Sequence, residues 1–267
     1  MSNSSSDSIR FTDGAAYERY MGRWSRLVGN AFLDWINPRA GLEWLDVGCG
    51  NGAFTELVYE RCAPAALDGV DPSEEQLAFA RTRPSARLAR FTRAGAESLP
   101  FPDDRFDAAV MPLVLHFVPD PARGVAEMAR VVRPGGIVAA YVWDMEDGGF
   151  PYAILLGELR AMGIGVPSAP SPHVSGLETL RRLWSGASLE EIETRAITAE
   201  RTFADFDDYW TAVLGGPSVA AGLAAMTVGD QDRLKTRLRE LLPCDAEGRI
   251  TYAARANAVH ASVPKPR

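Results

Sequence analysis

A short, mostly apolar run that ends in a dense group of glycines constrains the fold more than any other feature. Residues 42–47 suit a buried strand, and Gly48-Cys49-Gly50-Asn51-Gly52 follows directly, before residues 53–61, which have helical character. Glycine lets the chain turn sharply and lets a ligand approach the backbone closely. The amides of such a turn, backed by a helix N-terminus, form a polar cradle. The segment therefore predicts a strand–turn–helix unit that holds a ligand.

The alternation of strand and helix continues to residue 143. Further strands are expected at residues 66–70, 88–92, 106–111 and 137–143. A helix is expected at residues 73–83. Another is expected to start at Pro121, with Asp120 as its N-terminal cap, and to end at residues 134–136. Strands that are apolar on both faces belong in a parallel sheet that helices cover on each side. The fold class is therefore α/β, with a doubly wound, Rossmann-like, mostly parallel sheet.

Outside this region the pattern is mainly helical. A helix is expected at residues 15–37, and others at 152–162 and 177–184, with strands at 192–203 and 250–259. Residues 204–242 are expected to be helical in three pieces, with breaks near residues 215–217 and near Gly229. The resulting division has six parts. They are an N-terminal tail with cofactor-covering helices (residues 1–40), a cofactor-binding core (41–147), a lid (148–175), a completion of the core (176–203), a helical cap (204–248), and a final strand with a tail (249–267).

Composition excludes several classes of protein. The 267 residues carry a net charge of −7, so a nucleic-acid partner is not expected. Three cysteines without a CxxC motif suggest a reducing compartment, and no signal peptide or membrane span is evident, so a cytoplasmic protein without stable membrane insertion is predicted. No group of residues has metal-ligand spacing. A monomer or a homodimer is expected.

An acid after the second strand indicates which ligand the glycine turn holds. Asp71 lies 23 residues after Gly48, the spacing of a carboxylate that accepts hydrogen bonds from ribose hydroxyls. The glycine run is GxGxG and lacks the GxGxxG spacing of dinucleotide-binding proteins. Asp46, two residues before the first glycine, would repel a pyrophosphate but suits an ammonium group. A nucleoside that bears an amino acid is therefore favoured over NAD.

With these motifs in place, the chain resembles the class I S-adenosylmethionine-dependent methyltransferases, in the type 11 or UbiE-like branch. The resemblance covers residues 42–143 and rests on six segments in the family's order. These are Leu45-Asp46-Val47-Gly48-Cys49-Gly50-Asn51-Gly52, Gly69-Val70-Asp71-Pro72-Ser73, Gly95-Ala96-Glu97-Ser98-Leu99-Pro100-Phe101, Phe106-Asp107-Ala108-Ala109-Val110, Leu115-His116-Phe117-Val118 and Arg130-Val131-Val132-Arg133-Pro134-Gly135-Gly136. It implies the class I methyltransferase fold with helical cap insertions, and S-adenosylmethionine as cofactor with S-adenosylhomocysteine as product.

The resemblance also implies roles for individual residues. The methionine part of the cofactor would meet the backbone around Gly48 and Gly50, the ribose would meet Asp71, and adenine would meet Ala96 and Glu97. The carbonyl of Leu113 would lie near the cofactor amine. The remaining cofactor residues by resemblance are Tyr17, Tyr20, Arg26, Asp46, Cys49, Pro72, Ser73 and Gln76.

Several of these roles have a structural alternative that the sequence leaves open. Asp46 could cap the loop, Glu97 could be a surface residue, and Tyr20 could pack on the sheet edge. His116 is the candidate catalytic residue, because it is the only ionisable side chain between Pro112 and Pro119 and could act as a general base. A histidine that only shapes the pocket is equally compatible, since an anionic acceptor needs no base.

The function that follows is methyl transfer to a small-molecule substrate. The alternatives are a C-methyltransferase of quinones or polyprenyl phenols and a non-catalytic S-adenosylmethionine-binding protein. An NAD oxidoreductase is disfavoured because the third glycine of the GxGxxG fingerprint is missing. The sequence leaves open the identity of the substrate, the accepting atom, the use of a general base and the oligomeric state.

Overall fold

The computed structural model describes residues 18–166, 169–224 and 226–266, and one seven-stranded sheet organises them. The strand order is β3-β2-β1-β4-β5-β7-β6. The strands are β1 (Glu43–Val47), β2 (Ala66–Asp71), β3 (Ala89–Arg93), β4 (Phe106–Pro112), β5 (Val132–Trp143), β6 (Glu190–Phe203) and β7 (Ile250–Ser262). The first five pair in parallel, whereas β7 pairs antiparallel with both β5 and β6. The predicted mostly parallel sheet is confirmed.

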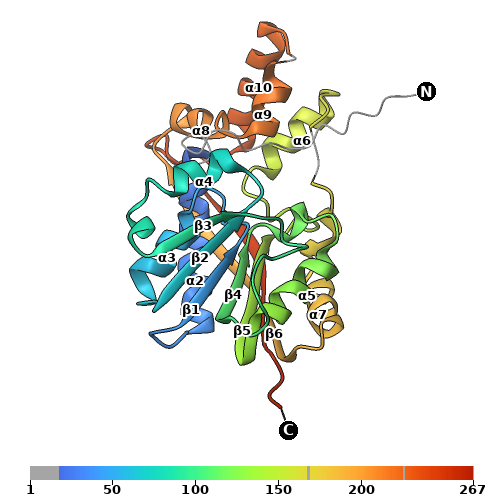
Figure 1. The fold of residues 1–267 in the computed structure, drawn as a ribbon. Coiled ribbons are helices and arrows are strands. Elements are labelled where there is room, and N and C mark those ends of the chain that lie inside the picture. Colours follow the sequence, from blue (N-terminus) through green and yellow to red (C-terminus); the bar gives the residue numbers. More distant parts are fainter. Residues whose placement is uncertain (1–17, 167–168, 225, 267) are drawn as a thin grey trace, which may run out of the picture.

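Helices cover both faces of this sheet (Figure 1). On one face α2 (Arg23–Ile36) and α3 (Ala53–Arg61) pack against apolar strand residues such as Trp44 and Tyr141. On the other face α5 (Pro121–Val131) and α7 (Leu177–Gly186) cover residues such as Val138. The five-residue helix η1 (Glu18–Gly22) precedes α2, and α4 (Glu74–Ala80) follows β2. The shortest helices are η2 (Pro84–Arg87), η3 (Leu115–Phe117) and η4 (Pro172–Ser175).

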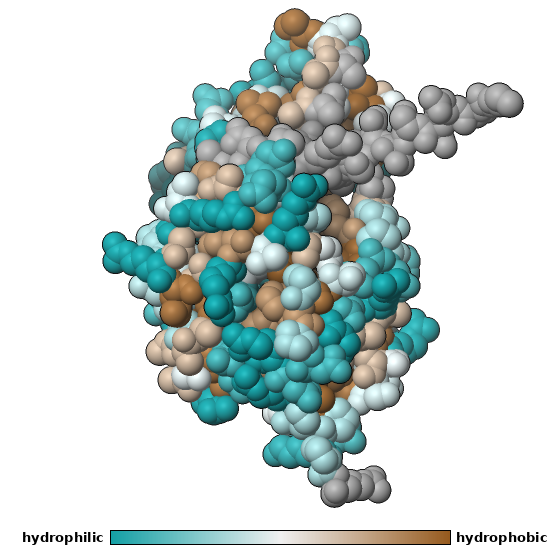
Figure 2. Space-filling view, in the orientation of Figure 1, coloured by the Kyte–Doolittle hydropathy of each residue, from teal (hydrophilic) through white to brown (hydrophobic). Residues whose placement is uncertain are grey.

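A helical cap lies beyond the carboxyl ends of the parallel strands, at the top of Figure 1. It consists of α6 (Ala153–Ala161), α8 (Phe206–Val213), α9 (Pro217–Ala224) and α10 (Val228–Leu241). Figure 2 shows several hydrophobic residues interspersed with hydrophilic ones on this cap, whereas hydrophilic residues dominate the lower part of the same face. Exposed large apolar side chains of the cap include Val228 and Leu241.

One sequence prediction within these elements is wrong, and two are confirmed. The three helical pieces predicted for residues 204–242 are present, and the second break falls between α9 and α10, just before Gly229, where the Thr227 hydroxyl caps the N-terminus of α10. The fifth strand does not start at residue 137. It starts at Val132 and contains an irregularity opposite Phe106–Ala108, which takes up the predicted turn at residues 134–136. The predicted cap Asp120 of α5 is confirmed, since its carboxylate accepts from the Arg123 amide.

Candidate functional site

The glycine turn after β1 is anchored to the end of β2. Gly48 has φ +73, and its amide and that of Cys49 both donate to the Val70 carbonyl oxygen, at 2.7 and 2.9 Å. A Cβ at Gly48 would lie 2.5 Å from both methyl groups of Val114, in the turn after β4. Only glycine therefore fits both the backbone conformation and the space at this position.

Asp71 brings the predicted acid and the glycine turn into direct contact. Its Oδ2 accepts from the Gly50 amide at 3.0 Å, and its Oδ1 accepts from the Ser73 amide at 2.9 Å. Burial raises the pKa of this carboxyl, and the two amides act against that shift. Because each carboxylate oxygen has two lone pairs, Asp71 can accept further hydrogen bonds from a ligand.

The residues that follow Asp71 form the N-terminal cap of α4 and its surroundings. The Ser73 hydroxyl caps this helix by accepting from the amide of Gln76, whose side chain is buried beside the turn. The Pro72 carbonyl accepts from Arg93 Nε at 3.0 Å. The structure thus brings four predicted residues together at the ends of β1 and β2, namely Gly50, Asp71, Ser73 and Gln76.

Asp46 is a buried carboxyl group beneath the turn, and it is only 1% exposed. The Thr55 hydroxyl donates to its Oδ2 at 2.6 Å, but its Oδ1 has no hydrogen-bond partner among the described residues. Burial, with a smaller contribution from the charge of Asp71, raises its pKa to about 7. Such a group gains most from a cationic neighbour. Burial also raises the pKa of the Cys49 thiol, which is therefore an inert filler.

The predicted adenine-side residues lie beside α5. Glu97 Oε1 accepts from the Asp120 amide at 3.0 Å, and the Glu97 carbonyl accepts from Arg123 Nε at 2.8 Å. Ala96 is half-buried and packs against the apolar core on this face. Glu97 thus fixes the start of α5, and contacts of Ala96 and Glu97 with adenine stay predictions.

The turn after β4 carries the other two predicted residues. Leu113 has φ +61, an unusual conformation for a non-glycine residue, and its amide donates to the Tyr141 carbonyl at 2.7 Å. His116 is 5% exposed, its Nδ1 has no partner among the described residues, and burial lowers its pKa to about 4. Its imidazole is therefore neutral at physiological pH and only weakly basic. A catalytic role for His116 stays a prediction.

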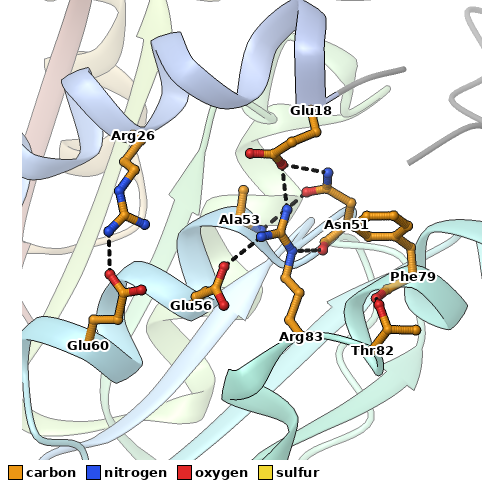
Figure 3. A network of polar contacts seen from close by, with 9 residues as sticks. All are labelled: Glu18, Arg26, Asn51, Ala53, Glu56, Glu60, Phe79, Thr82 and Arg83. Atoms are coloured by element: carbon orange, nitrogen blue, oxygen red, sulfur yellow. Dashed lines mark hydrogen bonds and ion pairs between the residues drawn. The ribbon is translucent and has the colours of Figure 1, made fainter. Parts of the chain in front are cut away.

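The N-terminal predictions concern Tyr17, Tyr20 and Arg26. Tyr17 lies outside the described residues. Tyr20 stacks on Tyr152 of the cap with ring centroids 4.5 Å apart, and its carbonyl accepts from the Tyr152 hydroxyl at 2.6 Å. Arg26 is exposed and forms an ion pair with Glu60 of α3, away from the glycine turn (Figure 3). No contact in the structure supports the predicted cofactor role of Arg26.

Sequence reasoning missed a polar network that ties η1 to the glycine turn (Figure 3). Arg83, just after α4, donates to the Asn51 carbonyl at 2.6 Å, to Glu56 of α3 at 2.6 Å, and to Glu18. The Asn51 side chain also donates to Glu18, at 3.2 Å. Glu18 and Arg83 are 65 residues apart in the chain, so no local sequence pattern predicts their pairing.

Within residues 18–166, 169–224 and 226–266, no group of three or more His, Cys, Asp or Glu side chains could hold a metal ion. Over the same ranges, every helix is too short or too polar to cross a bilayer.

Comparisons with known proteins agree with this geometry. Residues 45–140 match the protein family described as methyltransferase domain. An uncharacterised methyltransferase of Mycobacterium tuberculosis is 36% identical over 129 residues, which are 48% of this chain and 50% of that protein. The resemblance to class I methyltransferases of the UbiE-like branch is thus confirmed. The chain spans about half the length of these curated relatives.

Solved structures show the same fold. The YcgJ protein of Bacillus subtilis superposes with a TM-score of 0.61 at 21% identity, over 91% of this chain and 100% of that one. Phosphoethanolamine N-methyltransferase 2 of Haemonchus contortus, in complex with S-adenosyl-L-methionine, superposes with a TM-score of 0.58 at 18% identity, over 94% of this chain and 56% of that one. The predicted class I methyltransferase fold is therefore confirmed.

Proposed function

We propose that this chain is an S-adenosylmethionine-dependent methyltransferase that acts on a small-molecule acceptor. The observation that carries the proposal is the hydrogen bond of 3.0 Å between the Gly50 amide and Asp71 Oδ2. It places the glycine turn and the acid after β2 side by side, as two parts of one adenosyl-amino-acid site require. The match of residues 45–140 to methyltransferase domains supports the same conclusion.

The residues at the turn fit this cofactor. Asp71 would accept from the ribose hydroxyls, and the unpartnered Oδ1 of buried Asp46 would face the cationic amino-acid part, directly or through water. Among the described residues, a Cβ built at Gly50 meets only the Gln76 side chain, at 4.0 Å, which leaves room for a ligand beside this stretch of backbone. The Leu113 carbonyl and the Ala96 amide are proposed to contact the amine and adenine, respectively.

Methyl transfer from this cofactor requires mainly that the protein position the acceptor. The bound cofactor would supply a methyl group that its sulfonium centre already activates. The chain must hold the acceptor in line and exclude water. We assign the exclusion of water to residues 148–175 and 204–248, which contain the cap. His116 is the candidate proton acceptor, with its low pKa suiting it only to an acidic acceptor group.

Isothermal titration calorimetry with S-adenosylmethionine and with S-adenosylhomocysteine tests the proposal. One site per chain is expected for each ligand, and NAD is expected not to bind. An absence of heat with both adenosyl compounds, from protein that unfolds cooperatively, would refute the cofactor assignment.

Cofactor affinity is expected to rise with pH around neutrality. Because the pKa of Asp46 is raised to about 7, its carboxyl is mostly protonated at pH 6 and gains the charge that an ammonium prefers as the pH rises. If only the ionised form binds, affinity for S-adenosylhomocysteine increases about eightfold between pH 6 and 7.5. Calorimetry across this range measures the effect, and Asp46→Asn should remove the slope. A slope that persists in that variant would contradict the assignment.

Arg83→Met is expected to loosen the glycine turn. The change leaves Glu18 and Glu56 without their shared cation and frees the Asn51 carbonyl, at a cost of about 2–3 kcal/mol in stability. Affinity for S-adenosylhomocysteine should fall about threefold to tenfold. Arg61→Met is the matched control, since Arg61 pairs Asp34 between α3 and α2 away from the turn. An equal loss of affinity in both variants would contradict a specific role for Arg83.

A further inference from the structure

A buried arginine in β6 forms no ion pair with any carboxylate of the described residues. Arg201 is 7% exposed, and its Nε and Nη1 atoms have no hydrogen-bond partner among the described residues. A buried charge is costly unless it is paired and hydrogen-bonded. Burial lowers the pKa of Arg201, and the positive charge of exposed Arg23 lowers it further. The negative charge of Asp208 acts to raise this pKa, although Asp208 forms no ion pair with Arg201. An anionic ligand would satisfy this group.

Aromatic rings surround the guanidinium group and leave its edges available. Its carbon lies 4.2 Å from the ring centroid of Phe203 and 6.0 Å from that of Trp24. Stacking of this kind satisfies the flat face of a guanidinium, whereas its N–H groups point outward in the plane and still need acceptors. The ring of Phe203 stacks in turn on Tyr252, with centroids 5.9 Å apart.

Other unpartnered polar atoms gather at the same place. Trp24 Nε1 and the Tyr252 hydroxyl are buried and have no hydrogen-bond partner within the described ranges. Trp24 and Arg201 lie near enough to the Tyr152 hydroxyl to act on its pKa, but not in hydrogen-bond geometry, and that hydroxyl donates to the Tyr20 carbonyl. Native proteins leave few such atoms unsatisfied, so their concentration around one cation indicates a missing polar partner.

The position of this cluster matches that of an acceptor site. β6 runs parallel to β5, so Arg201, near its carboxyl end, lies at the edge of the sheet where α/β proteins bind ligands. The segment that starts at Glu18 links the two sites, because Glu18 contacts Asn51 of the glycine turn and Trp24 lies beside Arg201. Six residues of helix span about 9 Å, so the two sites are within reach of one cofactor and one small acceptor.

We propose that Arg201 binds a carboxylate of the methyl acceptor, whose flat apolar part lies against the aromatic cluster that contains Trp24, Phe203 and Tyr252. This inference rests on the proposed function and assigns it a substrate class, namely small aromatic carboxylic acids. A carboxylate matches the single charge and planar shape of a guanidinium. A phosphate would bring a second charge, for which the cluster offers only exposed Arg23.

Binding of paired probes to the protein saturated with S-adenosylhomocysteine tests the inference. Benzoate, phenylacetate and cinnamate are compared with their amides by calorimetry, in the wild type and in Arg201→Gln. At least one acid should bind more than tenfold more tightly than its amide, and Arg201→Gln should abolish that preference. Arg195→Gln is the matched control, because Arg195 lies exposed on the same strand over Trp35, at 5.3 Å, and should leave the preference intact.

A second measurement separates binding from a structural role. Because a buried, unpartnered charge destabilises the fold, Arg201→Met should retain or raise the midpoint of thermal unfolding while losing the preference for acids. A large fall in that midpoint, or no preference for any acid in the wild type, overturns the inference. If the wild type binds S-adenosylhomocysteine and no acid, only the inference fails, whereas loss of S-adenosylhomocysteine binding itself removes the proposed function.

Discussion

Asp71→Ala is expected to weaken binding of S-adenosylmethionine by more than tenfold. The carboxylate accepts from the amides of Gly50 and Ser73 and would also accept from ribose hydroxyls, so its removal costs the ligand charge-assisted hydrogen bonds and loosens the turn. Each hydrogen bond to a charged group is worth about 1.5–3 kcal/mol, and a tenfold change in affinity needs only about 1.4 kcal/mol. Calorimetry with S-adenosylmethionine and S-adenosylhomocysteine measures the loss.

Asp68→Ala separates this effect from a general loss of stability. Asp68 is a buried carboxylate of the same strand, three residues earlier, and it pairs with Arg90 at 3.2 Å. Its removal should lower the midpoint of thermal unfolding and leave cofactor affinity unchanged. Should Asp71→Ala bind the cofactor as tightly as the wild type, Asp71 would be only a structural residue of the turn.

The parts of the site that the sequence predicts are those that local chain geometry determines. A strand that ends in glycines and an acid after the next strand meet at one edge because parallel neighbours end together, and Gly50 and Asp71 do lie in contact. The parallel sheet follows in the same way from short apolar runs at regular intervals. The capping of the α5 N-terminus by Asp120 is equally local, since its carboxylate accepts from the amide of Arg123, three residues away.

The parts that the sequence does not predict depend on which distant side chain each arginine meets. Arg26 was expected at the cofactor but pairs with Glu60, whereas Arg83, in no recognised motif, holds the glycine turn through Glu18 and Asn51. Long charged side chains can reach many partners, and tertiary packing decides among them. Nothing in the alternation of β6 distinguishes exposed Arg195 from buried Arg201 either, because tertiary contacts such as that of Arg201 with Trp24 decide which of them is buried.

Gly48→Ala should disable the site as severely as the loss of Asp71. The alanine would have to keep φ at +73, at a cost of about 1–2 kcal/mol. Its Cβ would lie 2.5 Å from both methyl groups of Val114, and these cannot easily move aside because a β-branched side chain is stiff. Overpacking adds about 1–3 kcal/mol. We therefore expect a total loss of about 2–5 kcal/mol in the free energy of unfolding. Binding of S-adenosylhomocysteine should weaken more than tenfold, because the turn after β4 is pushed away from the glycine turn.

Two further variants identify the cause of that loss. Gly41 has φ +77, but nothing lies within 4 Å of a Cβ built there, so Gly41→Ala should show only the backbone cost and unchanged cofactor affinity. Combining Gly48→Ala with Val114→Ala relieves the clash and should restore part of both stability and affinity, as a positive coupling in a double-mutant cycle. Additive effects of the two changes would show that the contact between the turns after β1 and β4 does not hold the site together.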